Sequence, residues 1–288
     1  MKINLVFFGS SEFSVYVLDE LKLHHILPKL IVTTPDKPKG RKLVVTPTPV
    51  KIWAQKNNIK VLDPTSLKNN PTLSSQLSAL SSKLFLVASY GKIIPKKIFD
   101  IPEYKTLNIH PSLLPKYRGA SPIQSQVLYD NKDVGVTIIK IIEEMDAGPI
   151  ISKKDVNLEE WPVGKIELEK KLAIEGARLL IHILPEWIGG FIQGIPQDDS
   201  EATYCKKIKK EFGLLDIDLN DLSKNSYKNL LKIKAFEDWP RTYFIHNGKR
   251  VIIKEASIEN SKLKITKVIP EGKKEMTFED FLRGFKKE

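Results

Sequence analysis

The sequence predicts an α/β protein whose larger part is a doubly wound, mostly parallel sheet, followed by a smaller β-rich domain. Short apolar runs such as residues 2–9 and 84–89 are continuous rather than alternating, as in strands buried in a parallel sheet. Stretches with helical periodicity separate these runs, which is typical of a sheet with helices on both faces. Beyond residue 204 the pattern changes to alternating strands around turns such as Asn247-Gly248.

The elements of the larger part follow from the apolar runs and the residues that interrupt them. A Gly-Ser-Ser turn leads from the first strand into the first helix, and Pro111 ends the strand at 106–110 because proline donates no ladder hydrogen bond. We expect strands at residues 2–9, 29–34, 59–62, 84–89, 106–110, 134–142 and 149–156, and helices at 14–25, 51–58, 73–82 and 163–187, with another helix beginning near residue 121.

The connection at residues 35–49 is long and rich in proline, and its basic residues outnumber its single acid, Asp36. Loops of this length in compact domains are usually functional or disordered. Two interpretations follow from the residues: a basic arm that contacts the phosphates or end bases of an RNA, or a solvated surface loop.

Composition limits the class of protein. The 288 residues carry a net charge of +11, and +7 of it falls on residues 205–288, where 20 Lys or Arg oppose 13 Asp or Glu. Such an excess suits a surface that meets a polyanion, although a basic surface can also serve solubility alone. The single cysteine, Cys205, excludes an internal disulfide and a multi-cysteine metal site, and it favours a reducing cytoplasm. We expect neither a signal peptide nor a membrane span.

Residues 106–124 are the best candidate for a reaction site. Asn108 and His110 lie two apart on a strand, so both side chains project from the same face. A stiff loop follows, and then a helix start with Pro122 in its first turn. Doubly wound sheets bind ligands outside the carboxyl ends of their strands, so this amide and imidazole predict an active-site edge. Taken alone, His110 is better interpreted as a structural histidine, and it is the pairing with Asn108 that favours a catalytic role.

Five motifs along most of the chain resemble those of the folate-dependent formyltransferases, in the same order. The resemblance is greatest to the members that act on methionine esterified to tRNA. The motifs are TPDKPKGRKLVVTPTPVK at residues 34–51, VASYGKIIP at 87–95, NIHPSLLP with RGASPIQ at 108–124, VGVTIIKIIEEMDAG at 134–148 and AFEDWPRTY at 235–243.

The resemblance implies three parts of the chain. Residues 1–188 would form a Rossmann-like catalytic domain, and 189–204, rich in Gly, Pro and acids, would be a linker. Residues 205–288 would form an OB-like domain that binds tRNA. Because only four residues separate Ser257 from Lys262, where the family usually has more chain, we expect this barrel to be incomplete.

The resemblance also implies the chemistry: transfer of a formyl group from 10-formyltetrahydrofolate to the α-amino group of methionyl initiator tRNA, with no metal. Asn108 and His110 would donate hydrogen bonds to the oxyanion, and Asp146 would accept the proton of the amine. Without the resemblance, the acids at 143, 144 and 146 could not be told apart. The implied folate-pocket residues are Ser112, Leu113, Leu114, Pro115, Tyr90, Gly91 and Lys92, and the implied tRNA contacts are Arg41, Lys42, Lys206 and Lys207.

Two other classes of function share parts of this pattern. A formyltransferase that acts on a small amine, such as an amino sugar or a purine precursor, would keep Asn108, His110 and Asp146 but would need neither the basic arm nor the basic tail. A non-catalytic RNA-binding protein with the same fold would not depend on Asn108 or His110. We expect a monomer that works in the cytoplasm or in a bacterial-type organelle.

Overall fold

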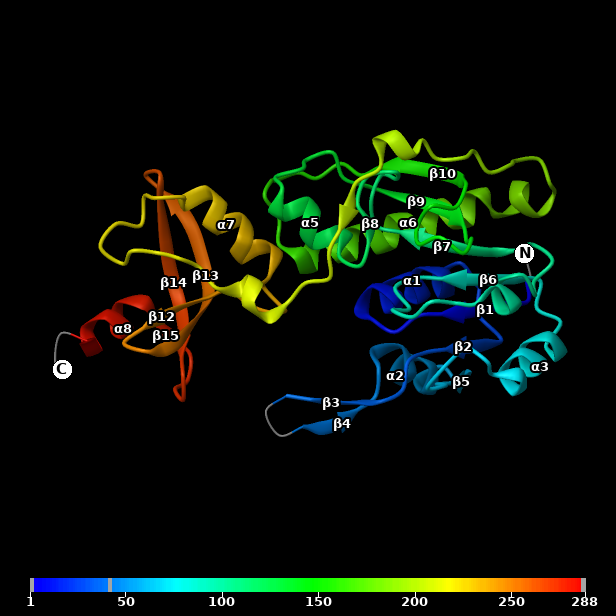
Figure 1. Ribbon diagram of the computed structural model, residues 1–288, viewed down its shortest axis with the longest axis horizontal. Coiled ribbons are helices and arrows are strands. Elements are labelled where there is room, and N and C mark those ends of the chain that lie inside the picture. The colour runs from blue at the N-terminus through cyan, green and yellow to red at the C-terminus, as the bar shows by residue number, and fades with distance from the viewer. Residues whose placement is uncertain (1–2, 41–42, 286–288) are drawn as a thin grey trace. The chain divides into compact units, whose positions relative to one another are not determined.

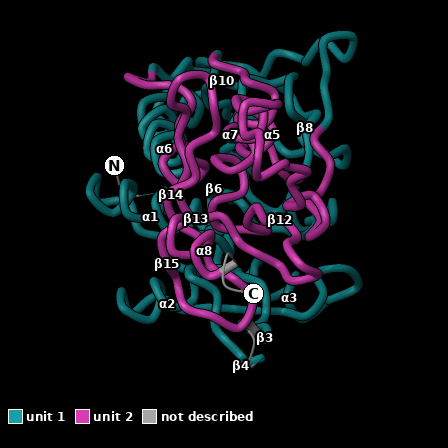
Figure 2. Tube along the Cα trace, turned by 90° about the vertical axis from the view of Figure 1, so that its left-hand side faces the viewer, with its two compact units in different colours: residues 1–119, 133–157, 169–204 teal, residues 120–132, 158–168, 205–288 magenta. Residues whose placement is uncertain are grey.

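The computed structural model describes residues 3–40 and 43–285 of the chain (Figure 1). Contacts between Cα atoms divide the chain into two compact units, which Figure 2 shows in two colours. Unit 1 comprises residues 1–119, 133–157 and 169–204, and unit 2 comprises residues 120–132, 158–168 and 205–288. Segments 120–132 and 158–168 therefore group with the C-terminal part. Arg41 and Lys42, predicted to contact tRNA, lie outside the described residues.

Unit 1 is built on a seven-stranded sheet in the order β10-β9-β7-β6-β1-β2-β5. The five strands from β7 to β5 run parallel, while β9 is antiparallel to both β7 and β10. The predicted doubly wound, mostly parallel sheet is confirmed. Its strands are β1 (Leu5–Phe8), β2 (Leu30–Val32), β5 (Lys60–Leu62), β6 (Leu84–Val87), β7 (Thr106–His110), β9 (Gly135–Lys140) and β10 (Ile150–Asp155).

Helices cover both faces of this sheet. On one face, α6 (Lys165–Ile188) approaches β7 so closely that a Cβ on Gly176 would lie 2.5 Å from Ile109, and an Arg178–Glu20 ion pair of 2.8 Å joins α6 to α1 (Glu12–Leu23). On the other face, α3 (Pro71–Ala79) and α4 (Lys96–Phe99) pack in an apolar cluster with Phe8 and Val87. Because Val87 pairs in register with Asn108, the α3–α4 face also carries Asn108.

The connection at residues 35–49 is not simply a loop. Residues Lys37–Lys39 (β3) and Val44–Thr46 (β4) pair as an antiparallel hairpin, followed by α2 (Pro49–Lys56). The predicted connection, either a basic arm or a surface loop, included no strands. Pro38 is unusual in a strand because it cannot donate to a ladder. In a hairpin of two strands each strand has a free edge, so the missing donor at Pro38 is tolerated.

Unit 2 contains an antiparallel sheet in the order β12-β13-β14-β15. Helices α7 and α8 pack on it around an apolar core that includes Phe244, Val251 and Phe281. The predicted turn between β12 and β13 has positive φ at both Asn247 and Gly248, as a type I′ turn requires. A complete OB barrel has five strands, and four are described here. The unit's elements are α5 (Pro122–Leu128), α7 (Ser226–Ala235), β12 (Tyr243–His246), β13 (Lys249–Glu259), β14 (Lys262–Pro270), β15 (Met276–Thr277) and α8 (Phe278–Phe285).

Candidate active site

The strand β7 presents three polar side chains on one face. Leu107 and Ile109 are fully buried on the α6 side, so Thr106, Asn108 and His110 face the side of α3 and α4. His110 is only 4% exposed, whereas Asn108 is half-buried. The carboxamide of Asn108 forms no hydrogen bond with any described residue. Its two N–H donors are therefore available to a ligand.

Both ring nitrogens of His110 face oxygen atoms. Nε2 lies 3.0 Å from the carbonyl oxygen of Tyr117, and because a carbonyl can only accept, Nε2 carries the hydrogen. Nδ1 lies 3.7 Å from Oδ1 of Asp146. This distance is longer than a hydrogen bond, so Nδ1 lies near the carboxylate without forming a hydrogen bond to it. The ring orientation is thus set by Tyr117, and the second nitrogen is free to serve a ligand.

Asp146 reaches His110 from the loop that follows β9. Its backbone has φ of +54°, a conformation that Asp tolerates better than most residues. Oδ2 accepts a 2.8 Å hydrogen bond from the backbone N–H of Gly119, which leaves Oδ1 directed at His110. The neighbouring acids Glu143 and Glu144 are exposed. Of the three acids in this loop, Asp146 is the one that the structure pairs with His110.

The loop after His110 is tied to β9 by one buried hydroxyl. Thr137 donates to the carbonyl oxygen of Ser112 at 2.6 Å and accepts from the backbone N–H of Leu114 at 3.0 Å. These two peptide groups of the predicted folate loop are therefore already used within the protein. Leu113 packs so tightly that a Cβ on Gly135 would lie 2.5 Å from it. The loop that continues to Pro115 is thus held firmly, with few main-chain donors to spare.

The other predicted folate residues lie at the end of β6. Tyr90 is 2% exposed, and its carbonyl oxygen accepts from the hydroxyl of Ser10 at 3.1 Å. Gly91 has φ of +76°, which explains glycine at this turn. The ammonium of Lys92 donates to the carbonyl oxygens of Pro64 and Thr65 at 2.9 and 2.8 Å. Partial burial, with Lys37 nearby, lowers the pKa of Lys92.

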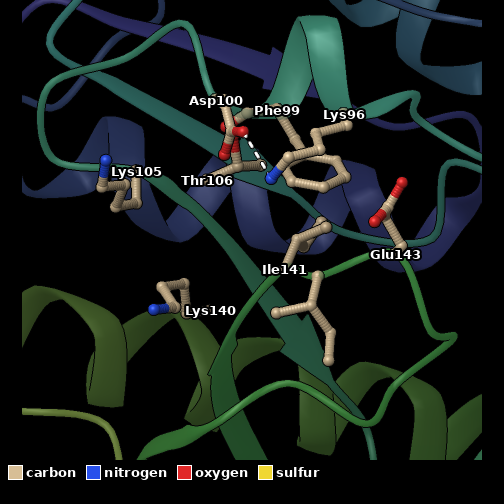
Figure 3. A pocket seen from close by; sticks show the side chains of 9 residues that line it. Lys96, Phe99, Asp100, Lys105, Thr106, Lys140, Ile141 and Glu143 are labelled. Atoms are coloured by element: carbon tan, nitrogen blue, oxygen red, sulfur yellow. Dashed lines mark hydrogen bonds and ion pairs between the residues drawn. The ribbon is translucent and has the colours of Figure 1, made fainter.

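A cavity of about 280 Å³ lies beside Thr106 (Figure 3). Thr106 projects from the same face of β7 as Asn108 and His110. The cavity was not predicted from the sequence. Thr106, at the start of β7, lies in its wall, and so does the beginning of the loop that leads to Asp146. The residues that line it are Lys96, Phe99, Asp100, Lys105, Thr106, Lys140, Ile141, Ile142 and Glu143, with an ion pair of 2.8 Å between Lys96 and Asp100.

Three further residues at the site were missed by the sequence reasoning. Gly119 donates to Asp146, and the side chains of Arg118 and Gln197 join the loop of Asp146 to the segment before residue 204. Arg118 and Gly119 stand within the RGASPIQ motif, so a closer look at that motif could have singled them out. Nothing in the sequence around Gln197 indicated a role.

The described part of the chain shows neither a metal site nor a membrane-spanning helix. Within residues 3–40 and 43–285, no group of three His, Cys, Asp or Glu side chains is placed to hold a metal ion. In the same ranges, no helix is long and apolar enough to cross a membrane. Lys206 and Lys207, predicted to contact tRNA, are exposed in unit 2.

The fold and the site together indicate a class of protein. Asn108 and His110 offer donors for an oxyanion, and Asp146 offers an acceptor for a proton, at one edge of a doubly wound sheet. This combination suits an enzyme that transfers a carbonyl-containing group to a nucleophile that must lose a proton.

Comparison with known proteins identifies the family. A family model described as formyl transferase matches residues 1–184. A methionyl-tRNA formyltransferase from Sulfurihydrogenibium sp. is 40% identical over 88% of this chain and 80% of its own length. Another from Bacillus subtilis is 37% identical over 97% of this chain and 94% of its own. The chain therefore belongs to the formyl transferase family and, within it, to the methionyl-tRNA formyltransferases, which confirms the resemblance seen in the motifs.

Solved structures support the fold. Methionyl-tRNA formyltransferase from Clostridium thermocellum aligns with a TM-score of 0.60 at 18% identity, over 93% of this chain and 98% of that one. An N-formyltransferase from Helicobacter canadensis, solved with folinic acid and dTDP-3-aminofucose, aligns with a TM-score of 0.63 at 19% identity, over 90% and 88%. At such identities the likeness concerns the fold alone.

Proposed function

We propose that this protein transfers a formyl group from 10-formyltetrahydrofolate to the α-amino group of methionine esterified to initiator tRNA. The main structural support for this proposal is the grouping of Asn108, His110 and Asp146. In this group, a carboxamide without a hydrogen bond to any described residue lies beside an imidazole that faces a carboxylate. Membership of the methionyl-tRNA formyltransferases supports both the formyl donor and the tRNA substrate.

Each side chain of the group meets one need of the reaction. The neutral amine attacks the formyl carbon, and the resulting oxyanion takes hydrogen bonds from the carboxamide of Asn108 and from Nδ1 of His110, which is a donor when the ring is cationic. The amine becomes cationic as its bond to carbon forms, and Asp146 accepts a proton from it, directly or through water. When the bond between the formyl carbon and N10 breaks, N10 takes up one proton. The amine has lost one proton, so the overall reaction neither releases nor consumes a proton.

We assign part of the donor to the cavity beside Thr106. Successive residues on one face of a strand lie about 7 Å apart, so the cavity begins about one such step from Asn108 and two from His110. Phe99 and Ile141 supply apolar surface for a flat ring, as is usual in small-molecule sites. A donor seated here would extend along β7 and bring its formyl group to the Asn108 and His110 side chains. In this proposal, residues 90–92 and 112–115 would border the part of the donor that lies outside the cavity.

The tRNA contacts are proposed on charge. Lys206 and Lys207 are exposed on the net-positive C-terminal part of the chain, and Arg41 and Lys42 belong to the basic connection of residues 35–49. We retain the predicted division into a catalytic domain (1–188), a linker (189–204) and a tRNA-binding domain (205–288) as part of this proposal. A monomer in a reducing cytoplasm also remains a prediction.

An assay with a choice of acceptors tests the function. The purified protein is given labelled formyl-folate together with either charged initiator tRNA or small amines such as amino sugars. We expect label on the tRNA alone; label on an amino sugar and none on tRNA would refute the proposal. Asn108→Ala should lower kcat about 10²- to 10³-fold, the usual cost of one oxyanion donor. His110→Ala should lower kcat at least as much without weakening tRNA binding.

The donor cavity is tested separately. Ile141→Trp fills the cavity and should raise KM for formyl-folate, with KM for tRNA unchanged. Ile166→Trp, at a half-exposed position that does not line the cavity, is the control and should leave both KM values near those of the wild type. An unchanged KM for formyl-folate in Ile141→Trp would place the donor elsewhere.

A further inference from the structure

The loop that carries Asp146 needs support from outside itself. Asp146 has a positive φ, and Gly148, two residues on, sits so close to β9 that a Cβ there would lie 1.8 Å from the carbonyl oxygen of Lys140. Within the loop, the backbone N–H of Ala147 bonds to Glu144 only at 3.5 Å. The peptide groups around Asp146 therefore gain little from one another, and their carbonyl oxygens point toward residue 197.

Gln197 takes up both of these carbonyl oxygens. Its side-chain Nε2 donates to the carbonyl oxygen of Asp146 at 2.8 Å and to that of Gly148 at 2.7 Å. The two hydrogens of one amide nitrogen thus pin the turn on either side of Ala147. Only a side chain with two donors on one atom can hold both carbonyls in this way.

Arg118 fixes the other end of the same carboxamide. Its Nε and Nη2 donate to Oε1 of Gln197 at 3.0 and 2.8 Å, so the amide cannot rotate to exchange its oxygen and nitrogen. Arg118 is 2% exposed, and its Nη2 also pairs with Asp199 at 2.8 Å. Burial lowers the pKa of Arg118, but the hydrogen bonds to Asp199 and Tyr204 outweigh this and raise it. The guanidinium is therefore a permanent, charged anchor.

The same stretch of chain reaches the other members of the site. Gly119, next to Arg118, donates its N–H to the carboxylate of Asp146, and Tyr117 accepts from His110. The segment from Gln197 to Thr203 supports both, because Thr203 accepts from the backbone N–H groups of Tyr117 and Arg118 at 2.8 Å through its hydroxyl and carbonyl oxygens. Residues 197–203, which were expected to be only part of a linker, thus support both the loop that carries Asp146 and the short strand β8 (Arg118–Gly119).

We propose that Gln197, oriented by Arg118, is a positioning residue that sets the backbone of Asp146 and thereby aims its carboxylate at His110 and the amine of the substrate. The inference rests on the proposed function, since it assigns Gln197 a task only if Asp146 accepts the proton. The side chain of Gln197 bonds to Arg118 and to the backbone of the Asp146 loop, and not to the side chains of Asn108, His110 or Asp146, so the role assigned to it is positioning rather than catalysis.

Two substitutions separate this role from packing. Gln197→Glu keeps the size and the acceptor for Arg118 but turns an oxygen toward two carbonyl oxygens, which removes both donors. Gln197→Met removes the donors without adding charge. Because a displacement of about 1 Å can cost about 10²-fold in rate, we expect kcat to fall 10- to 100-fold in both variants, with KM for tRNA and formyl-folate unchanged. Gln193→Glu, the same change at an exposed position nearby, should keep wild-type kcat.

A double-mutant cycle with Asp146→Asn gives the decisive readout. If Gln197 works through Asp146, adding Gln197→Met to Asp146→Asn lowers kcat no further. Multiplied losses in the double mutant, or wild-type kcat in both single Gln197 variants, would overturn the inference while leaving the proposed function intact. So would a loss of the folded state in both, seen by thermal unfolding. If Asp146→Asn itself retains wild-type kcat, it is instead the proposed role of Asp146 that fails, and the inference fails with it.

Discussion

The buried hydroxyl of Thr137 offers a sharp test of how the loop after His110 is held. Thr137 pairs in register with His110 and is fully buried, and its hydroxyl is bonded both to Ser112 and to Leu114. Thr137→Val preserves the shape of the side chain but leaves one carbonyl oxygen and one N–H without a partner. Each such buried group costs about 1–3 kcal/mol, so the expected loss of stability is about 2–6 kcal/mol.

Thr137→Ser is the matched control, because it keeps the hydroxyl and loses one methyl group, worth about 1 kcal/mol. Urea unfolding reports the change in global stability, and amide hydrogen exchange of the peptide that contains Leu114 reports the local change. We also expect Thr137→Val to raise KM for formyl-folate, since the loop is proposed to border the donor. A valine variant as stable as the serine variant would refute the reasoning.

Three further predictions follow from individual residues. Gly148→Ala should lower kcat more than tenfold, because the new Cβ would overlap a backbone oxygen of β9 and displace the loop that carries Asp146. Gly284 has open space around it, so Gly284→Ala is the control and should keep the wild-type kcat. Measurement of kcat for both variants tests this prediction. Burial raises the pKa of the Tyr90 phenol above its ordinary value of about 10, so the folded state retains a proton that the unfolded chain releases. This contribution to stability is complete below about pH 10 and declines as pH rises above it. Tyr90→Phe should therefore make the alkaline decline in urea unfolding shallower, while Tyr227, whose pKa is also raised, keeps its own share of the decline. Because the Tyr90 hydroxyl lacks a hydrogen-bond partner among the described residues, the substitution should cost little at neutral pH. Lys206→Ala and Lys207→Ala should each reduce the slope of log affinity for tRNA against log salt by about 1, and an unchanged slope would remove that lysine from the RNA surface.

Local patterns in the sequence predicted much of the fold. Continuous apolar runs identified the strands of the central sheet, and the Asn247-Gly248 dipeptide identified the hairpin of β12 and β13. The hairpin β3–β4 was missed, because Pro38 is unfavourable in a ladder and only the pairing of the two short strands with each other offsets this. The contacts that residues 189–204 make with the active-site loops were also not predicted. Their composition is that of a linker, and composition does not show whether side chains such as Gln197 form hydrogen bonds with the rest of the domain.

By itself, the sequence determined that Asn108 and His110 share a face of one strand, because the alternation of side chains along a strand is a local property of the backbone. The choice of Asp146 among three nearby acids came from the family motif. Only the tertiary structure decided that its carboxylate reaches His110 and that Gln197 supports its loop. Those contacts join residues 36 and 51 positions apart, and no local pattern reports how the chain returns to bring such residues together.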